Sequence, residues 1–125
     1  MIRVYPASKL KDGALWRSLD WPCVLFVARW LKHELIGTPD IRANAKTFWQ
    51  EDEEDIKACD IVLVYASVDN HLRGALVEAG MGIAHGKRII VVGQHADYGT
   101  WQYHPRVQSV IDLDDAYRLL KAMDR

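Results

Sequence analysis

Glu78 has the strongest potential for chemistry in this sequence, because small residues surround it. It follows the segment Arg-Gly-Ala-Leu-Val at 73–77. At helical spacing it shares a stripe with Ala75 and Gly82, so little bulk would shield its carboxylate. An acid early in a helix is also held in its ionised form by the helix dipole. The pattern fits a solvated acid that supports the helix, and it also fits a reactive carboxylate beside a ligand that Gly74 allows to approach.

A run of five acids at 51–55 lies in the preceding helical pattern. Such a run usually marks a solvated helix face. Asp52 and Asp55, however, share a stripe with apolar residues at 3–4 spacing, so we expect both beside the buried face. Paired carboxylates across a cleft suit glycosyl transfer, because one attacks the anomeric carbon while the other handles protons or orients the first. The spacing leaves open whether Asp52 or Asp55 partners Glu78.

Several candidate binding residues directly follow expected strands. Ser8 and Lys9 could bring a hydroxyl, a backbone N–H and an ammonium group onto an anion, although the segment also fits an ordinary polar loop. Arg29 and Trp30 could offer a charge and a stacking face to a base, although such a tryptophan equally fits the core. Asn70 follows the third strand and is a further candidate for substrate binding.

Metal and cofactor motifs do not fit this sequence. The five histidines show no His-x-x-x-His spacing and the two cysteines no Cys-x-x-Cys spacing, so we expect no metal site. The phosphate-loop pattern Gly-x-x-x-x-Gly-Lys-Ser/Thr is missing. Residues 80–86 match Gly-x-Gly-x-x-x-Gly, but they lie within an expected helix rather than at a strand–helix turn. We therefore expect no metal and no organic cofactor.

Short β-branched runs alternate with helical patterns along the chain. The runs are apolar throughout, as expected of strands that are covered on both faces. The alternation predicts a single α/β domain over residues 1–125, a doubly wound, flavodoxin-like three-layer fold with a five-stranded parallel sheet. We expect strands at residues 2–5, 23–27, 61–65, 88–92 and 107–111, and helices at residues 10–19, 47–58, 73–85 and 113–123.

The predicted strand order, 2-1-3-4-5, places the site. Folds of this kind bind ligands outside the carboxyl ends of the strands, where the strand order reverses. We therefore expect one cavity, surrounded by residues that follow strand ends or open the third helix: Ser8, Arg29, Asp69 or Asn70, and Glu78.

Two packing details also follow from the sequence. Pro6 is expected to break the first strand, because proline lacks the N–H that a strand ladder uses. In the helix that carries Glu78, one stripe of residues at 3–4 spacing is expected to face the sheet. This stripe is formed by Leu76, Ala79, Gly80 and Ile83.

Composition indicates a globular, cytoplasmic protein. Of the 125 residues 50% are hydrophobic and 26% charged, and the net charge of −1 gives no field that attracts nucleic acid or an anionic membrane. The apolar runs are too short to span a bilayer, and the opening does not resemble a signal peptide. Cys23 and Cys59 lie in apolar stretches and are expected to be buried, reduced thiols. Exposed-looking tryptophans predict a homodimer or larger assembly: Trp16, Trp21, Trp49 and Trp101.

Three segments in order resemble the nucleoside 2-deoxyribosyltransferase family and its nucleotide N-glycosidase relatives. They are Asp-Ile-Val-Leu-Val at 60–64, Gly-Ala-Leu-Val-Glu-Ala-Gly-Met-Gly-Ile-Ala at 74–84 and Gly-Lys-Arg-Ile-Ile at 86–90. The family reads as an aspartate-led strand, a variable loop, a Gly-x-x-x-Glu-x-Gly helix start and a Gly-Lys before the next strand. The opening Tyr-Pro-Ala-Ser at 5–8 is similar to the family's first strand and substrate loop.

The resemblance implies one transferase-like or glycosidase-like domain of nucleotide metabolism over residues 1–125. It matches Glu78 to the nucleophilic glutamate and Asp52 to the acid that positions or protonates. It places Ser8 where the glycosidase branch contacts phosphate. It also implies a homo-oligomer whose partner is a small-molecule nucleoside or nucleotide, with no nucleic acid polymer, membrane or cofactor.

The sequence departs from the family in several places, one of which is a loop at residues 67–72 that is longer than usual. Leu-Arg-Gly at 72–74 stands where many transferases have Asp-Ser-Gly, so the sugar contact behind a deoxyribosyl preference is missing, and Arg73 could suit a phosphate or a different base. The segment Trp-Gln-Tyr-His-Pro at 101–105 has no counterpart in the well-studied transferases and indicates a small branch.

The leading hypothesis is cleavage or transfer of the N-glycosidic bond of a nucleoside or nucleotide through Glu78. One alternative is a non-catalytic nucleotide-binding or signalling module, in which Asp52 and Glu78 need not meet. Another is an NAD-cleaving hydrolase of the related interleukin-receptor-like fold, which also relies on a helix glutamate.

Overall fold

The computed structural model describes residues 1–36, 43–66, 72–93 and 99–124. Within them the strands form one parallel sheet in the order β2-β1-β3-β4-β5, which confirms the predicted α/β fold and strand order. The order reverses between β1 and β3, which lie side by side. The strands are β1 (Ile2–Ala7), β2 (Val24–Phe26), β3 (Ile61–Tyr65), β4 (Arg88–Val92) and β5 (Val107–Val110).

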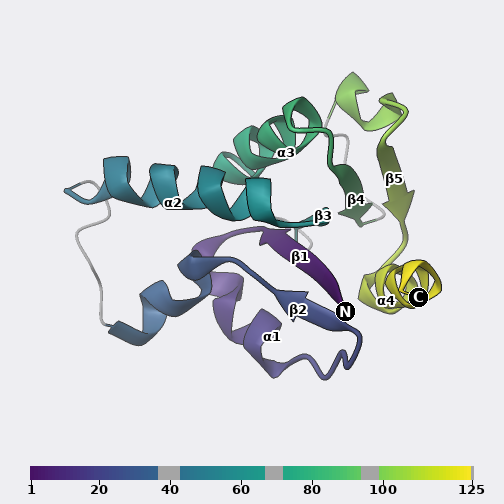
Figure 1. The fold of residues 1–125 in the computed structure, drawn as a ribbon, viewed down its shortest axis with the longest axis horizontal. Coiled ribbons are helices and arrows are strands. Elements are labelled where there is room, and N and C mark those ends of the chain that lie inside the picture. Colours follow the sequence, from purple (N-terminus) through teal and green to yellow (C-terminus); the bar gives the residue numbers. More distant parts are fainter. Residues whose placement is uncertain (37–42, 67–71, 94–98, 125) are drawn as a thin grey trace.

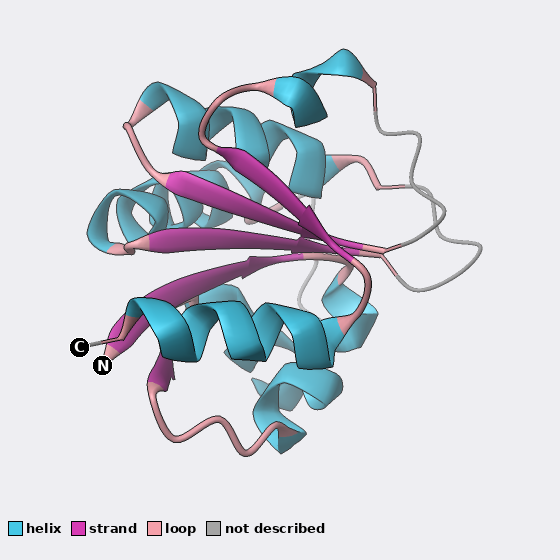
Figure 2. Cartoon of the chain, turned by 90° about the vertical axis from the view of Figure 1, so that its right-hand side faces the viewer, coloured by secondary structure: helices cyan, strands magenta, loops and turns pink. Residues whose placement is uncertain are grey.

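Helices cover both faces of this sheet and make the fold three-layered (Figures 1 and 2). Helices α2 (Ala45–Ala58) and α3 (Gly74–Ala84) pack on one face. Helices α1 (Gly13–Ser18) and α4 (Leu113–Met123) lie on the other. Among the described residues, no helix has the combined length and apolarity needed to cross a bilayer.

The central strands are buried because both of their faces are covered. Residues 61–64 of β3 and 89–92 of β4 are all buried, which explains why these runs are apolar without alternation. Ile56 of α2 packs into this core, and Trp16 of α1 and Leu120 of α4 are fully buried as well.

Strand β1 runs through Pro6, so the expectation that this proline breaks the strand was wrong. Pro6 is in register with Leu63 of β3, whereas the pairing of β1 with β2 extends only to Val4 and Phe26. A missing N–H is harmless on a side where the neighbouring strand has ended. The carbonyl oxygen of Pro6 accepts a hydrogen bond from Trp30 Nε1 at 2.9 Å.

The other differences from the expected elements concern short helices. The expected helix at 10–19 is a 3₁₀ turn, η1 (Leu10–Asp12), followed by α1. Two further 3₁₀ segments were not predicted, η2 (Arg29–Ile36) and η3 (Thr100–Tyr103). Segments this short carry too few residues to show a periodic apolar pattern.

Helix α3 packs on the sheet with its small side, which corrects part of the expected orientation: Ala79 is buried as expected, but Leu76 and Ile83 are only partly buried. The buried residues of α3 are Ala75, Glu78, Ala79 and Gly82, whereas Gly80 is exposed. A Cβ atom on Gly82 would lie 2.7 Å from Val62 Cγ2 and 2.8 Å from Ile89 Cδ1, so the helix backbone approaches the strands as only glycine allows. This close approach takes the Glu78 side chain into the interior.

The tryptophans are more buried than the sequence suggested. Trp16 is only 1% exposed, and Trp21 stacks on Tyr117 with ring centroids 5.0 Å apart. Trp49 is the tryptophan that remains 37% exposed. Trp16 therefore gives no reason to expect an oligomer, and the homodimer stays a prediction.

Candidate functional site

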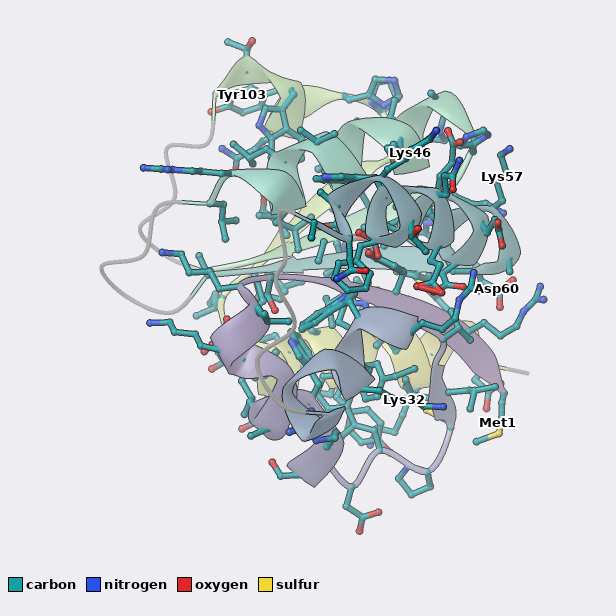
Figure 3. The ribbon with its side chains drawn as sticks, turned by 90° about the vertical axis from the view of Figure 1, so that its left-hand side faces the viewer. Met1, Lys32, Lys46, Lys57, Asp60 and Tyr103 are labelled. Atoms are coloured by element: carbon teal, nitrogen blue, oxygen red, sulfur yellow. The ribbon has the colours of Figure 1, made fainter. Side chains whose placement is uncertain are left out.

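A cavity of about 580 Å³ opens at the carboxyl end of β1, between η2 and the helices α2 and α3. Figure 3 shows the side chains from the side on which α2 begins, where Lys46 is labelled. Six of the predicted site residues line this cavity. They are Ser8, Lys9, Trp30, Asp52, Gly74 and Glu78.

Arg29 does not line this cavity with the other predicted residues, which corrects one part of the expected site. Its backbone N–H donates to Asp55 Oδ2 at 2.8 Å and its Nε donates to Asp55 Oδ1 at 3.0 Å. Its guanidinium also reaches Glu54 at 3.0 Å. Arg29 therefore binds the acids of α2 and joins η2 to that helix. Asn70 and Asp69 lie outside the described residues.

The pairing with Arg29 also bears on which acid of α2 stands beside Glu78. Asp55 is buried and turned toward Arg29, whereas Asp52 lines the cavity together with Glu78. The geometry thus brings Asp52, and not Asp55, to the side of Glu78.

Glu78 is a buried carboxylate in the second turn of α3, not a solvated acid at the helix start. Only 7% of the residue is exposed. Its pKa is raised to about 8, chiefly by burial and to a lesser extent by the negative charge of Asp52, while the Tyr5 hydroxyl acts in the opposite direction. A carboxyl group held in this way is poised to change its charge near neutral pH.

Asp52 is half-buried and its pKa is raised to about 6, mainly by desolvation. The Tyr5 hydroxyl again lowers the pKa of this carboxyl, whereas the acids Asp55 and Glu51 raise it. Because the pKa of Asp52 lies below 7 and that of Glu78 above it, Asp52 is mostly ionised at pH 7 while Glu78 is mostly protonated. Such a pair can divide acid and base roles between its members.

Tyr5 connects the two carboxyl groups. Its side chain is fully buried, and both Glu78 and Asp52 raise the pKa of its phenol in addition to burial. Three buried oxygens meet in this region, Tyr5 Oη, Asp52 Oδ1 and Glu78 Oε2, and within the described part of the chain none makes a hydrogen bond of normal geometry. Buried polar atoms without protein partners are typical of a site that uses them on a ligand.

Aromatic side chains form the walls beside these acids. Trp30 lines the cavity and is fixed by its hydrogen bond to Pro6. Phe48 and Trp49 line it from α2. The six-membered ring of Trp49 lies against Gly74, where an added Cβ would be 3.5 Å from Trp49 Cη2 and 3.9 Å from Glu78 Oε1.

Cationic and hydroxyl groups also line the cavity. Lys9 and Ser8 come from the segment after β1, and Arg73 comes from the residue before α3. The cavity therefore combines flat apolar surfaces, two carboxyl groups and several hydrogen-bond donors. Among the described residues, no three side chains of the metal-ligating types gather closely enough to hold an ion.

Sequence reasoning missed Tyr5 and Trp49 as site residues. In the sequence Tyr5 stands out only as part of the Tyr-Pro-Ala-Ser motif, although it lies in the strand that leads directly to Ser8. Trp49 has the pattern of a surface aromatic, although it precedes Asp52 by one helical turn. That spacing, read together with the expected cavity, is the signal that could have identified it.

No protein-family model matches the sequence, and no curated protein matches it. Among solved structures, the chain is similar to the CMP N-glycosidase BcmB of Clostridium botulinum. The TM-score is 0.53 at 19% sequence identity, and the match covers 97% of this chain and 98% of the other. At this identity, the likeness shows that the two chains share a fold.

Proposed function

We propose that the protein cleaves or transfers the N-glycosidic bond of a nucleoside or nucleotide, with Glu78 as the nucleophile. The observation that carries the proposal is the meeting of Glu78 and Asp52 in one aromatic-walled cavity, with the buried Tyr5 hydroxyl acting on both carboxyl groups. Two carboxyl groups with different pKa values suit bond cleavage at an anomeric carbon. The fold shared with a CMP N-glycosidase supports the same reaction class.

The reaction proceeds in two displacements. At pH 7 the pair holds one proton, mostly on Glu78, so the reaction begins with transfer of this proton to Asp52, which ionises Glu78. Glu78 then attacks the anomeric carbon, the carbon–nitrogen bond breaks, and its electron pair passes to the base, which takes the proton from Asp52. Water or a second base then attacks the same carbon and displaces Glu78, and Asp52 takes the proton that this nucleophile releases. The enzyme returns to its starting state.

The remaining lining residues bind the substrate in this scheme. Trp30, Phe48 and Trp49 offer faces on which a planar base stacks. Lys9 and Arg73 offer charge to an anionic group, and Gly74 leaves room beside Glu78.

The raised pKa of Glu78 gives the mechanism a distinctive pH dependence. With a pKa of about 8, only about one-tenth of Glu78 is ionised at pH 7. The reaction needs one proton on the pair of carboxyl groups, so kcat/KM should be greatest between about pH 6 and pH 8 and fall on either side. A profile that keeps rising above pH 8 would exclude Asp52 as the proton donor.

A substrate panel tests the proposal. Nucleosides, nucleoside 5′-monophosphates and NAD are incubated with the protein, and released bases are separated by chromatography. We expect base release from nucleosides or monophosphates, and a covalent sugar ester on Glu78 by mass spectrometry when a 2′-fluorinated substrate slows its hydrolysis. Nicotinamide release alone would assign the protein to NAD cleavage, and ligand binding without any release would make it a binding module.

A further inference from the structure

A buried tryptophan holds the hydroxyl group of Ser8. Trp16 Nε1 donates a hydrogen bond to Ser8 Oγ at 2.7 Å, and Trp16 is only 1% exposed. The indole ring is fixed by an edge contact with Tyr65 at 5.5 Å and a tilted contact with Phe26 at 5.7 Å. Trp16 does not line the cavity, whereas Ser8 does.

This hydrogen bond determines what Ser8 can offer to a ligand. An indole N–H only donates, so Ser8 must be the acceptor in the pair. The hydroxyl proton of Ser8 then remains available, and it is donated to no other side chain or backbone group among the described residues. Ser8 therefore presents a donor to the cavity, with its oxygen held at a fixed point.

The two nearby cations have the same preference. Lys9 follows Ser8 directly, and Arg73 lines the cavity from the start of α3. Ammonium and guanidinium groups have no acceptor, and the Ser8 hydroxyl adds its proton as a further donor. A ligand group with several acceptor oxygens and negative charge, such as a phosphate monoester, complements such a set.

We propose that Trp16 is a positioning residue for substrate selection. By holding Ser8 as a donor, it gives the cavity a preference for a phosphorylated nucleoside over the same nucleoside without its phosphate. The inference rests on the proposed function, because it concerns the substrate of the same site.

The test compares a nucleoside 5′-monophosphate with its parent nucleoside. Trp16→Phe keeps an aromatic ring in the core but removes the N–H, and Trp21→Phe is the matched control, because Trp21 stacks on Tyr117 and does not line the cavity. We expect Trp16→Phe to raise KM for the monophosphate roughly fivefold to tenfold with little change in kcat. KM for the nucleoside should stay within about twofold, as should both values in Trp21→Phe.

A double-mutant cycle separates positioning from general packing. If Trp16 acts through Ser8, the Ser8→Ala/Trp16→Phe double variant binds the monophosphate no more weakly than Ser8→Ala alone. Equal losses on both substrates, or losses that add in the double variant, would overturn the inference.

Binding measurements keep this test independent of catalysis. Titration calorimetry of the same variants gives the same comparison when nothing is cleaved, so a failed proposed function and a failed inference give different results. If Trp16→Phe does not fold, NMR of the natural protein replaces it. The indole N–H signal of Trp16 is identified as the one that moves in Ser8→Ala, and it is then followed as each ligand is added. The inference requires this signal to shift with the monophosphate and not with the nucleoside, and the reverse result overturns it.

Discussion

Asp52 and Asp55 lie one turn apart on α2 and have opposite surroundings. Asp55 accepts hydrogen bonds from the backbone and the guanidinium of Arg29, and it is 8% exposed. Asp52 points into the cavity, where its Oδ1 is buried with no normal hydrogen bond in the described part of the chain. The same residue type is thus a structural tie at one position and an unpaired acid at the next.

The difference teaches how structural and reactive carboxylates can be told apart. A structural acid has its partners within the protein, and losing them lowers stability. A reactive acid keeps oxygens free inside a cavity, although desolvation makes its ionised form unfavourable. By this criterion Glu78 and Asp52 fit the reactive role that we propose for them, and Asp55 does not.

Glu78→Gln gives the largest expected effect. Glutamine keeps the size of the side chain but cannot attack as an anion, so we expect turnover to fall at least roughly 1,000-fold while substrate binding is nearly unchanged. Single-turnover assays and calorimetry measure the two quantities. A variant that retains natural base release would exclude Glu78 as the nucleophile.

Asp52→Asn should slow turnover by about 100-fold, because asparagine cannot accept or donate the proton that the reaction moves. The covalent sugar ester should still be trapped, because Asp52 does not form it. Mass spectrometry of the fluorinated-substrate complex checks this point. Complete loss of the ester would contradict the division of roles between the two acids.

The stability of the protein should decrease as the pH rises. The folded-state pKa of Glu78, about 8, exceeds its ordinary value of 4.5, so the folded state binds more protons than the unfolded state between these values. We expect the free energy of unfolding to fall by about 2 kcal/mol from pH 6 to pH 8. Urea titrations at both pH values measure it, and Glu78→Gln should remove most of the slope.

Asp55→Asn should give the smallest effect, and one on stability rather than chemistry. Asparagine keeps one acceptor for Arg29 but loses the charge, so unfolding should become easier by about 1 kcal/mol. The effect on kcat should be within about threefold, because Asp55 does not face Glu78. A loss of activity as large as that of Asp52→Asn would erase the contrast between the two acids.

The fold was predictable from the sequence because its strands are continuous apolar runs. The runs at 61–65 and 88–92 coincide with β3 and β4, because a strand that is covered on both faces needs apolar residues at successive positions. The general place of the site followed from the strand order, which sets where the carboxyl ends meet.

The direction of individual side chains was less predictable. Helical 3–4 spacing predicts one buried stripe of α3, but the close fit of Gly82 against Val62 and Ile89 turns the smaller residues toward the sheet instead. Arg29 follows a strand end as expected, but its guanidinium forms ion pairs with Glu54 and Asp55 of α2 and does not line the cavity. Such outcomes depend on three-dimensional neighbours that no local pattern records.

The contact of Gly82 with β3 and β4 has a consequence for how the acidity of the site can be tuned. The depth of Glu78 in the protein depends on how near α3 lies to the sheet, and that distance is limited at a position one turn away, outside the cavity lining. A side chain there would collide with Val62 and Ile89, so either these side chains or the helix must shift. Where the helix moves away from the sheet, solvent reaches Glu78 and the pH at which its carboxyl group ionises falls. A substitution at position 82 could therefore change the pH at which the site works, although every residue that lines the cavity stays the same.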